Sequence, residues 1–339
     1  MQKKDITALA LIGVAAAAVL AYIVQQSMPA PTPPRSPIAE GPAEVVPLAG
    51  PKPTWAFAML PSVPIPPPIP EDAQIRRIPG SSQALTLGNT KDRFNPPDWW
   101  PDDHPAMPPI VATGQAPEVF ACSYCHLPNG FGRPENASLA GKPVEYMVHH
   151  MNAFRDGTRT GMRMPAIARL VSDADAREAA VYFNKLQPTA WVEVIESDTA
   201  PRTKAVGGLL VADKPQVLEP IGHRIIEVAK DIERTELRDA RSPFVAYVPR
   251  GSVTRGRAIV ASVLDETKAC STCHGPDLRG AGLIPGIAGR SPSYTVRELY
   301  DMQSGARHNL EAEPMKPIVA NMRIDDMIAV AAYLGTLKP

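Results

Sequence analysis

The 339-residue sequence has few aromatic residues (6%), only four cysteines and no excess of charge, since 35 basic side chains balance 35 acidic ones. A balanced charge argues against a nucleic-acid-binding protein, which normally presents a strongly basic face. Four cysteines are too few for a disulfide scaffold of this size. Glycine (23 residues) is outnumbered by proline (39 residues), which excludes a long helical bundle and a multi-span membrane protein. The length is enough for about two domains.

One long hydrophobic run stands near the N-terminus. Residues 6–24 are 19 consecutive uncharged residues, and about 20 apolar residues span a bilayer as a helix. Lys3 and Lys4 precede the run, and the next basic residue is Arg35. The positive-inside rule therefore predicts a transmembrane anchor over residues 1–27, with the rest of the chain outside the cytoplasm. A cleaved signal peptide is the alternative, and it places the rest of the chain on the same side.

Proline dominates the next segment, residues 28–94. Fifteen of the 42 residues from 29 to 70 are proline, which prevents a helix or a central strand because proline has no N–H and clashes with the preceding turn. We predict an extended, semi-rigid linker. Residues 55–60 and 61–70 are apolar enough to lie against the folded part of the chain instead.

Two C-x-x-C-H motifs, CSYCH at residues 122–126 and CSTCH at residues 270–274, contain all four cysteines. This is the motif of c-type haem attachment. Two thiols three positions apart on a helical turn can form thioethers with the two vinyl groups of one porphyrin, and the histidine that follows can coordinate the iron. We predict two covalently bound haem c groups. The predicted attachment residues are Cys122, Cys125, Cys270 and Cys273, and the predicted iron ligands are His126 and His274.

Other roles for these cysteines explain the pattern less well. A single C-x-x-C pair is compatible with a thioredoxin-like redox site or with half of a zinc site. One zinc site made of all four cysteines leaves both histidines unexplained. Two disulfides within the motifs would close strained, short loops.

An internal repeat predicts the second axial ligand of each iron. The two motifs are offset by 148 positions, and the same offset aligns Leu139-Ala140-Gly141 with Ile287-Ala288-Gly289, Tyr146 with Tyr294, Gly157 with Gly305, and Arg159 with Arg307. After a three-residue insertion the offset becomes 151, and Met164 falls on Met315. The chain therefore contains two copies of one module, residues 95–190 and 250–339. A soft thioether sulfur at the same place in both copies predicts Met164 and Met315 as iron ligands.

Other candidates for the sixth ligand lack this symmetry. Met162 competes in the first module, but it falls on Leu310 or Glu313. His149 and His150 are adjacent on a predicted helix, so both cannot face the haem, and neither has a histidine counterpart in the second copy.

Each module is predicted to be small and mostly helical. Helical spacing of apolar residues, with acidic residues at two of the starts, predicts helices over residues 143–154, 173–186, 254–263, 291–303 and 325–337. Gly256 is small enough for close packing of its helix. Prolines at the equivalent positions predict a shortened first helix in the first module. Pro128 and Pro276 each follow a motif histidine by two residues, and we predict that their turn presents a carbonyl to that histidine.

Residues 191–249 belong to neither copy. Partly alternating, β-branched segments predict short strands or extended segments that brace the two modules. These segments are residues 191–195, 206–211, 224–228 and 244–248.

The two motifs, the LAG and IAG elements, the DGTR and SGAR elements and the stretch CHGPDLRGAGLIPGIAGRSPSY (residues 273–294) resemble tandem dihaem class I cytochromes c of bacteria. The resemblance implies two cytochrome c-like haem domains that are packed face to face. With the other segments, the expected fold is mostly α, with a partly extended or β segment between the domains and an N-terminal transmembrane helix. The expected location is the inner membrane, with both haem domains on the periplasmic side.

Two His/Met-ligated haems have no open iron position, which favours electron transfer over enzymatic chemistry. The expected partners are redox proteins, either a quinol oxidoreductase, an oxidase or a dehydrogenase, which the chain serves as a shuttle or as a cytochrome subunit. The alternative function is a dihaem peroxidase, which also carries two C-x-x-C-H motifs but needs one haem with an open position. The matched methionines argue against that alternative.

Overall fold

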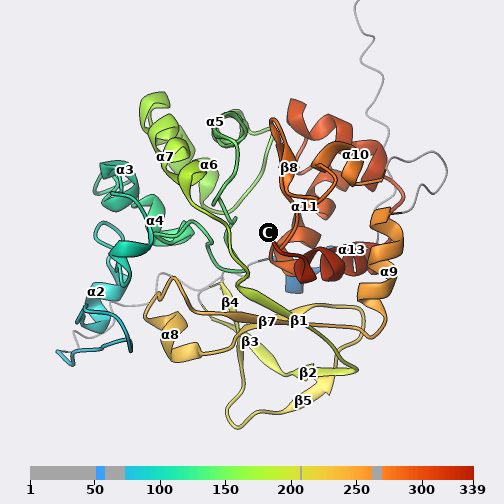
Figure 1. Cartoon of the computed structure of the whole chain (residues 1–339), viewed down its shortest axis with the longest axis horizontal. Helices are drawn as coiled ribbons and strands as arrows, with labels where there is room; N and C mark the ends of the chain where they lie inside the picture. The colour runs from blue at the N-terminus through green and yellow to red at the C-terminus, as the bar shows by residue number, and fades with distance from the viewer. Residues whose placement is uncertain (1–50, 58–72, 207, 262–268) are drawn as a thin grey trace, which may run out of the picture. The chain divides into compact units, whose positions relative to one another are not determined.

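The structure, a computed structural model, describes residues 51–57, 73–206, 208–261 and 269–339 (Figure 1). All of these residues belong to one compact unit. The hydrophobic run at residues 6–24, predicted as an anchor, lies outside the described residues. Among the residues that are described, we find no helix with the length and hydrophobicity that a membrane crossing requires.

The first repeat folds as short helices followed by two longer ones. Its elements are η2 (Pro101–Asp103), α3 (Pro109–Ala112), α4 (Cys122–His126), α5 (Val144–Asp156), α6 (Met164–Leu170) and α7 (Asp173–Lys185). Helix α5 ends at Gly157, whose φ of +82° suits glycine, and α7 begins after Ser172, whose side chain caps the N–H of Asp175. The predicted helices 143–154 and 173–186 are confirmed, and the four-residue α3 confirms the shortened first helix.

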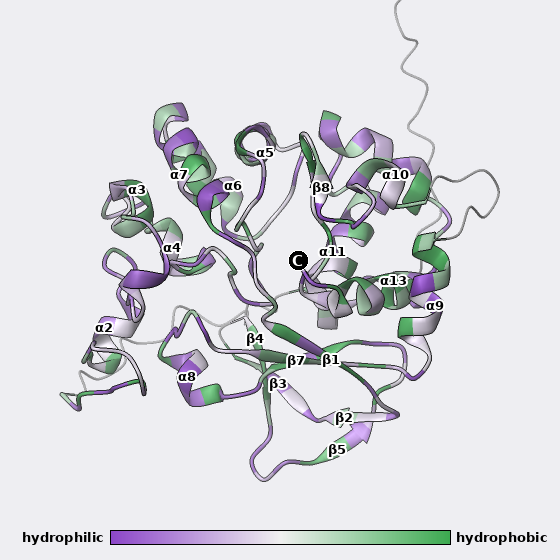
Figure 2. Cartoon of the chain, viewed as in Figure 1, coloured by the Kyte–Doolittle hydropathy of each residue, from purple (hydrophilic) through white to green (hydrophobic). Residues whose placement is uncertain are grey.

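The second repeat follows the same order with a full first helix. Its elements are α9 (Ser252–Ala261), α10 (Ser271–His274), β8 (Gly280–Ala281), β9 (Ile284–Pro285), α11 (Pro292–Gln303), η4 (Leu310–Met315), α12 (Lys316–Val319) and α13 (Ile324–Thr336). The predicted helices 291–303 and 325–337 are confirmed. Helix α9 packs on α13 at Gly256, where a Cβ atom would lie 1.9 Å from the carbonyl oxygen of Ala329. Figure 2 shows hydrophobic and hydrophilic residues together on α7 and α9, as expected of helices with one buried face.

Residues between the repeats form a five-stranded mixed sheet in the order β1-β7-β6-β4-β3. The elements of this segment are β1 (Val192–Glu196), β2 (Thr199–Pro201), β3 (Thr203–Val206), β4 (Leu209–Ala212), β5 (Leu218–Pro220), β6 (Ile226–Ala229), α8 (Ile232–Glu236) and β7 (Phe244–Val248). Strand β1 pairs in parallel with β7, and β7 pairs antiparallel with β6. Strands β2 and β5 form a separate antiparallel ribbon.

The sheet refines two predictions. The repeats are helical as expected, and the short strands predicted at residues 191–195, 224–228 and 244–248 are confirmed, but they pair into a sheet that gives the fold more β structure than the expected mostly α fold. The expected strand at residues 206–211 is two strands of a hairpin: β3 ends at Val206, β4 begins at Leu209, and Gly208 adopts a φ of +90° between them.

Part of the proline-rich segment packs against the second repeat. The residues Trp55, Ala56 and Phe57 join the apolar core of that repeat, and Ala56 is 2% exposed within the 3₁₀ helix η1 (Thr54–Ala56). Farther along, Thr86 caps the short helix α2 (Leu87–Lys91). The expectation that residues 55–60 lie against the folded part is confirmed for residues 55–57, and residues 58–70 lie outside the described residues.

Candidate functional site

The eight residues predicted to attach and ligate haem line one cavity of about 1310 Å³. Both repeats and residues of the segment 51–57 contribute to its walls. The eight residues are Cys122, Cys125, His126, Met164, Cys270, Cys273, His274 and Met315.

Helix α4 presents the first motif to this cavity. Cys122 and Cys125 lie three positions apart on one helical turn, and neither forms a disulfide. Burial raises the pKa of the Cys122 thiol to about 12 and also raises the pKa of Cys125. In the part of the chain that the structure describes, no three His, Cys, Asp or Glu side chains are close enough to hold a metal ion. The four cysteines therefore do not form the alternative zinc site.

Each motif histidine is oriented by a backbone carbonyl. Nδ1 of His126 lies 2.9 Å from the carbonyl oxygen of Ala137, and Nδ1 of His274 lies 2.8 Å from that of Pro285. A carbonyl oxygen only accepts hydrogen bonds, so Nδ1 carries the proton and Nε2 keeps its lone pair for a metal. Ala137 and Pro285 are separated by the repeat offset of 148, so both copies position the histidine in the same way.

These carbonyl partners differ from the predicted ones. The turns at Pro128 and Pro276 were expected to present a carbonyl to each histidine, but the carbonyl of Pro128 itself accepts a hydrogen bond from the Tyr182 hydroxyl at 2.6 Å. The acceptors instead lie eleven residues after each histidine: Ala137 lies in a loop, and Pro285 is the last residue of β9. Sequence separation alone does not reveal such a contact.

The two predicted methionine ligands occupy the same place in each repeat. Met164 is the first residue of α6, and Met315 is the last residue of η4, immediately before α12. Met162 also lines the cavity, but its side chain is 50% exposed. The structure thus brings a cysteine pair, a histidine and a methionine from each repeat to the walls of the same cavity.

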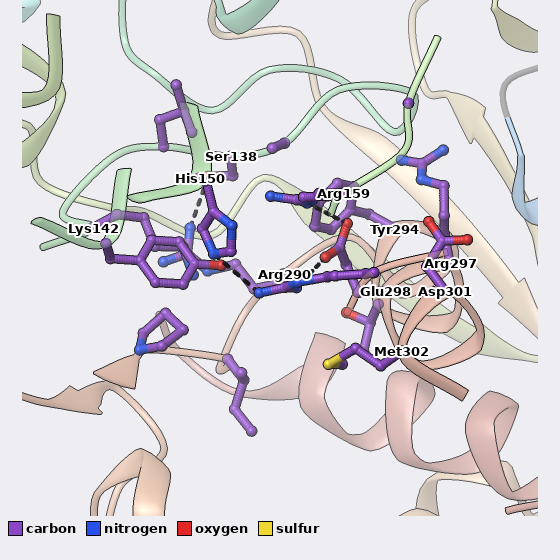
Figure 3. Close-up of a pocket in the computed structure, with 18 of the residues that line it drawn as sticks. Ser138, Lys142, His150, Arg159, Arg290, Tyr294, Arg297, Glu298, Asp301 and Met302 are labelled. Carbon is purple, nitrogen blue, oxygen red and sulfur yellow. Dashed lines mark hydrogen bonds and ion pairs between the residues drawn. The ribbon is translucent and has the colours of Figure 1, made fainter. Parts of the chain in front are cut away.

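A buried network of charges, which the sequence did not predict, joins the two repeats (Figure 3). Arg159 of the first repeat forms an ion pair of 2.8 Å with Glu298 on α11, and Arg307 binds the other oxygen of the same carboxylate. The backbones of Arg159 and Arg307 form an isolated antiparallel bridge. Although burial alone would raise it, the two arginines hold the pKa of Glu298 well below its usual range. One carboxylate therefore serves two repeat-equivalent arginines.

Two further contacts across the repeats are reciprocal. Nζ of Lys142 donates to the carbonyl of Gly286 at 2.6 Å, and Nη1 of Arg290 donates to Oγ of Ser138 at 2.8 Å. Lys142 and Arg290 are related by the offset of 148, as are Ser138 and Gly286. The repeats are consequently joined through equivalent surfaces, with an approximate two-fold relationship between them.

The network contains more buried cations than anions. Lys142, Arg159 and Arg307 are buried, Arg290 is partly buried, and all four line the cavity beside the partly buried Glu298, the acid that pairs with Arg159 and Arg307. Burial, together with the charge of Arg290, lowers the pKa of Lys142 well below its ordinary value, and Glu298 offsets only part of this effect. Nε of Arg307 and Nδ1 of His150 are buried with no partner among the described residues. A haem carries two carboxylate groups, so a surplus of buried cations fits that cofactor.

Comparison with known proteins places this arrangement in a family. Cytochrome c-552 of Acidithiobacillus ferridurans is 37% identical to the chain over 237 residues, which cover 67% of this chain and 80% of the relative. The chain belongs to the cytochrome c family. The family profile described as Cytochrome c matches residues 253–338 of this cytochrome, which include the second motif and Met315.

Two other relatives are more distant. The thiosulfate dehydrogenase electron acceptor of Thiomonas intermedia is 26% identical over 222 residues, covering 65% of this cytochrome and 79% of the relative. Cytochrome c4 of Pseudomonas aeruginosa is 24% identical over 233 residues, covering 67% and 88%. The chain is therefore a class I cytochrome c with covalently bound haem c, and it is an electron-transfer protein rather than an enzyme.

Proposed function

We propose that this cytochrome carries two haem c groups and transfers electrons between redox partners on the periplasmic side of the inner membrane, to which its N-terminus tethers it. The observation that carries the proposal is the matched construction of the two motifs. Each pairs two cysteines with a histidine whose Nδ1 is bound by a repeat-equivalent carbonyl, and each lies on the wall of the cavity that also receives a repeat-equivalent methionine.

In the first site, Cys122 and Cys125 would form the thioethers, and Nε2 of His126 and the sulfur of Met164 would ligate the iron. Cys270, Cys273, His274 and Met315 have the same roles in the second site. The bound haem supplies reversible one-electron chemistry at its iron. The carbonyls of Ala137 and Pro285 fix each imidazole plane and keep the proton on Nδ1, which makes Nε2 a better donor to the metal.

The surplus of cations between the repeats supports two haems and not one. Lys142 and Arg290 are equivalent in the two copies and each crosses to the other repeat, so each is available to neutralise a haem carboxylate at the junction. Because Lys142 and Arg290 are held by hydrogen bonds across the junction, they would keep the polar environment of the haems fixed when an electron is exchanged.

Ligation of each iron by both a histidine and a methionine would leave no position for a substrate, which is why we propose electron transfer and not peroxidase chemistry. Relatives named as an electron acceptor of a thiosulfate dehydrogenase and as a cytochrome subunit of sulfide dehydrogenase support a dehydrogenase as donor. A quinol oxidoreductase and an oxidase are the other partner classes. The anchor and the periplasmic location rest on Lys3, Lys4 and the uncharged run 6–24.

Spectroelectrochemical titration of the full chain in detergent tests this function. We expect two one-electron transitions, low-spin spectra for both haems and no turnover of hydrogen peroxide. A five-coordinate, high-spin haem with peroxide turnover would establish the dihaem peroxidase instead. Met162→Leu provides a matched control for Met164→Leu: the first keeps both low-spin haems, and the second converts one haem to a high-spin form.

A further inference from the structure

Two acidic side chains of α11 line the cavity one helical turn apart, and only one of them is ion-paired. Glu298 is bound by Arg159 and Arg307. Within the described residues, the carboxylate of Asp301 has no hydrogen bond or ion pair, although it also lines the cavity. Figure 3 shows Glu298 turned toward Arg159, with Asp301 and Arg297 beside it.

Only the second repeat has an acid at this position. The repeat offset places Asp301 on Ala153 of α5, which is 3% exposed. The first haem site therefore lacks the equivalent carboxylate, so the first site can serve as an internal control for the second.

Arg297, the cation with the largest effect on Asp301, is occupied by other partners. Arg297, one turn before Asp301 on α11, donates to the carbonyl of Ala56 at 3.0 Å and to the carbonyl of Pro134 at 2.9 Å. Its guanidinium is thus held by the segment 51–57 and by the first repeat, and it does not pair with Asp301.

The segment 51–57 covers this corner of the cavity. The ring of Phe57 packs edge-on against Tyr300 at 5.8 Å, and Nζ of Lys52 lies 3.9 Å above the ring of Phe57. Lys52 and Phe57 both line the cavity. The segment belongs to neither repeat, and among the described residues it packs against the core of the second repeat, so it covers the second site.

Burial and the neighbouring Glu298 raise the pKa of Asp301 to about 6, against the opposing effect of Arg297, Lys52 and Arg159. These are the charged groups that face it, from α11, from the covering segment and from the first repeat, and Tyr300 is its titratable neighbour in the chain. A carboxylic acid with this pKa changes charge close to neutral pH.

We propose that Asp301 is a proton-binding site coupled to reduction of the second haem. This rests on the proposed function. One electron from the redox donor adds one negative charge to the cavity, the carboxylate of Asp301 takes one proton from water, and both leave when the electron passes to the acceptor. Coulomb repulsion between the added electron and an ionised carboxylate is the physical cause of the coupling.

The test is the pH dependence of the two reduction potentials in the full-length holoprotein. Protonation of Asp301 favours the reduced state, so the potential of one haem falls as the pH rises between about 5 and 8, with a limiting slope of about 59 mV for each tenfold change in proton concentration. The potential of the other haem does not change with pH over this range.

In Asp301→Asn the pH dependence of the potential is lost, and the carboxylic acid band of the wild type disappears from the reduced-minus-oxidised infrared spectrum. In Lys52→Met the sloping region moves to higher pH, because a cation that lowers the pKa of Asp301 is removed.

Asp102→Asn, a change of an exposed acid in η2, is the matched control and keeps the slope. A slope that survives in Asp301→Asn, or that both wild-type haems share equally, overturns the proposal. Haem content and a redox titration at a single pH distinguish failure of the proposed function from failure of the role of Asp301. Fewer than two haems per chain refutes the proposed function. Two haems whose reduction potentials do not change with pH refute only the role of Asp301.

Discussion

Gly256 lies where α9 crosses α13, and its replacement by alanine has two opposing effects on the free energy of unfolding. The added Cβ would lie 1.9 Å from the carbonyl oxygen of Ala329 and 2.8 Å from Cβ of Tyr333. Separations below 3.0 Å do not occur for real Cβ atoms, so α9 and α13 must move apart by about 1.1 Å to raise 1.9 Å to 3.0 Å. Because the obstacle is backbone, no side chain can rotate out of the way.

The size of the effect follows from two known terms. Overpacking in a well-packed core costs about 1–3 kcal/mol, and contact with a backbone atom belongs at the upper end. Alanine stabilises a helix interior by about 1 kcal/mol relative to glycine. Gly256→Ala should therefore lower the free energy of unfolding by about 2 kcal/mol, measured by urea denaturation of the holoprotein.

Gly335→Ala in α13 is the comparison, because its new Cβ would meet the side chains of Pro292 and Val194 at 2.8 and 2.9 Å. Those side chains can shift, so we expect a smaller decrease in the free energy of unfolding than for Gly256→Ala. A Gly256→Ala protein as stable as the wild type, or more stable, would refute the packing argument, since helix propensity alone predicts that result.

Two further predictions concern the ligands and the junction of the repeats. Met164→Ala and Met315→Ala should each abolish the long-wavelength iron–sulfur absorption band at one haem while leaving that haem covalently attached; single mutants that both retain the full band would disprove the assignment. Glu298→Gln should lower the free energy of unfolding by about 3 kcal/mol, because two buried arginines lose their counter-charge, whereas Glu313→Gln at an exposed ion pair should change it by less than about 1 kcal/mol. The pKa of Glu298 is depressed in the folded protein, so its contribution is complete above the unfolded value of 4.5 and is lost as the pH falls below it. The thermal stability of Glu298→Gln should accordingly vary less with pH below about 4.5 than that of the wild type, and an identical acid profile would contradict this.

The helices and the motif residues were predictable because their signals are local or repeated. A C-x-x-C-H motif fixes its own geometry within one helical turn, and the repeat offset compares one module with the other, so Met164 and Met315 could be selected from twelve methionines. Helix ends such as Ser172 and Gly157 depend on single residues with known preferences.

The sheet and the buried network of charges between the repeats could not be predicted in this way, because both depend on contacts between residues far apart in the sequence. Strand β1 pairs with β7 about fifty residues later, Val192 opposite Phe244, and no short-range pattern specifies that register. Arg159 and Arg307 were already matched by the repeat offset, but an offset says that two residues are equivalent and not that they meet. The role of Glu298 between them needs the relative placement of both modules.

Haem content per chain tests the central claim most directly. The pyridine haemochrome assay on the purified full-length chain should give two covalently bound haems per polypeptide, and Cys270→Ala with Cys273→Ala should give one that survives acid–acetone extraction. A wild-type value of one or none would contradict the presence of two haem sites and, with it, the proposed transfer of electrons between them.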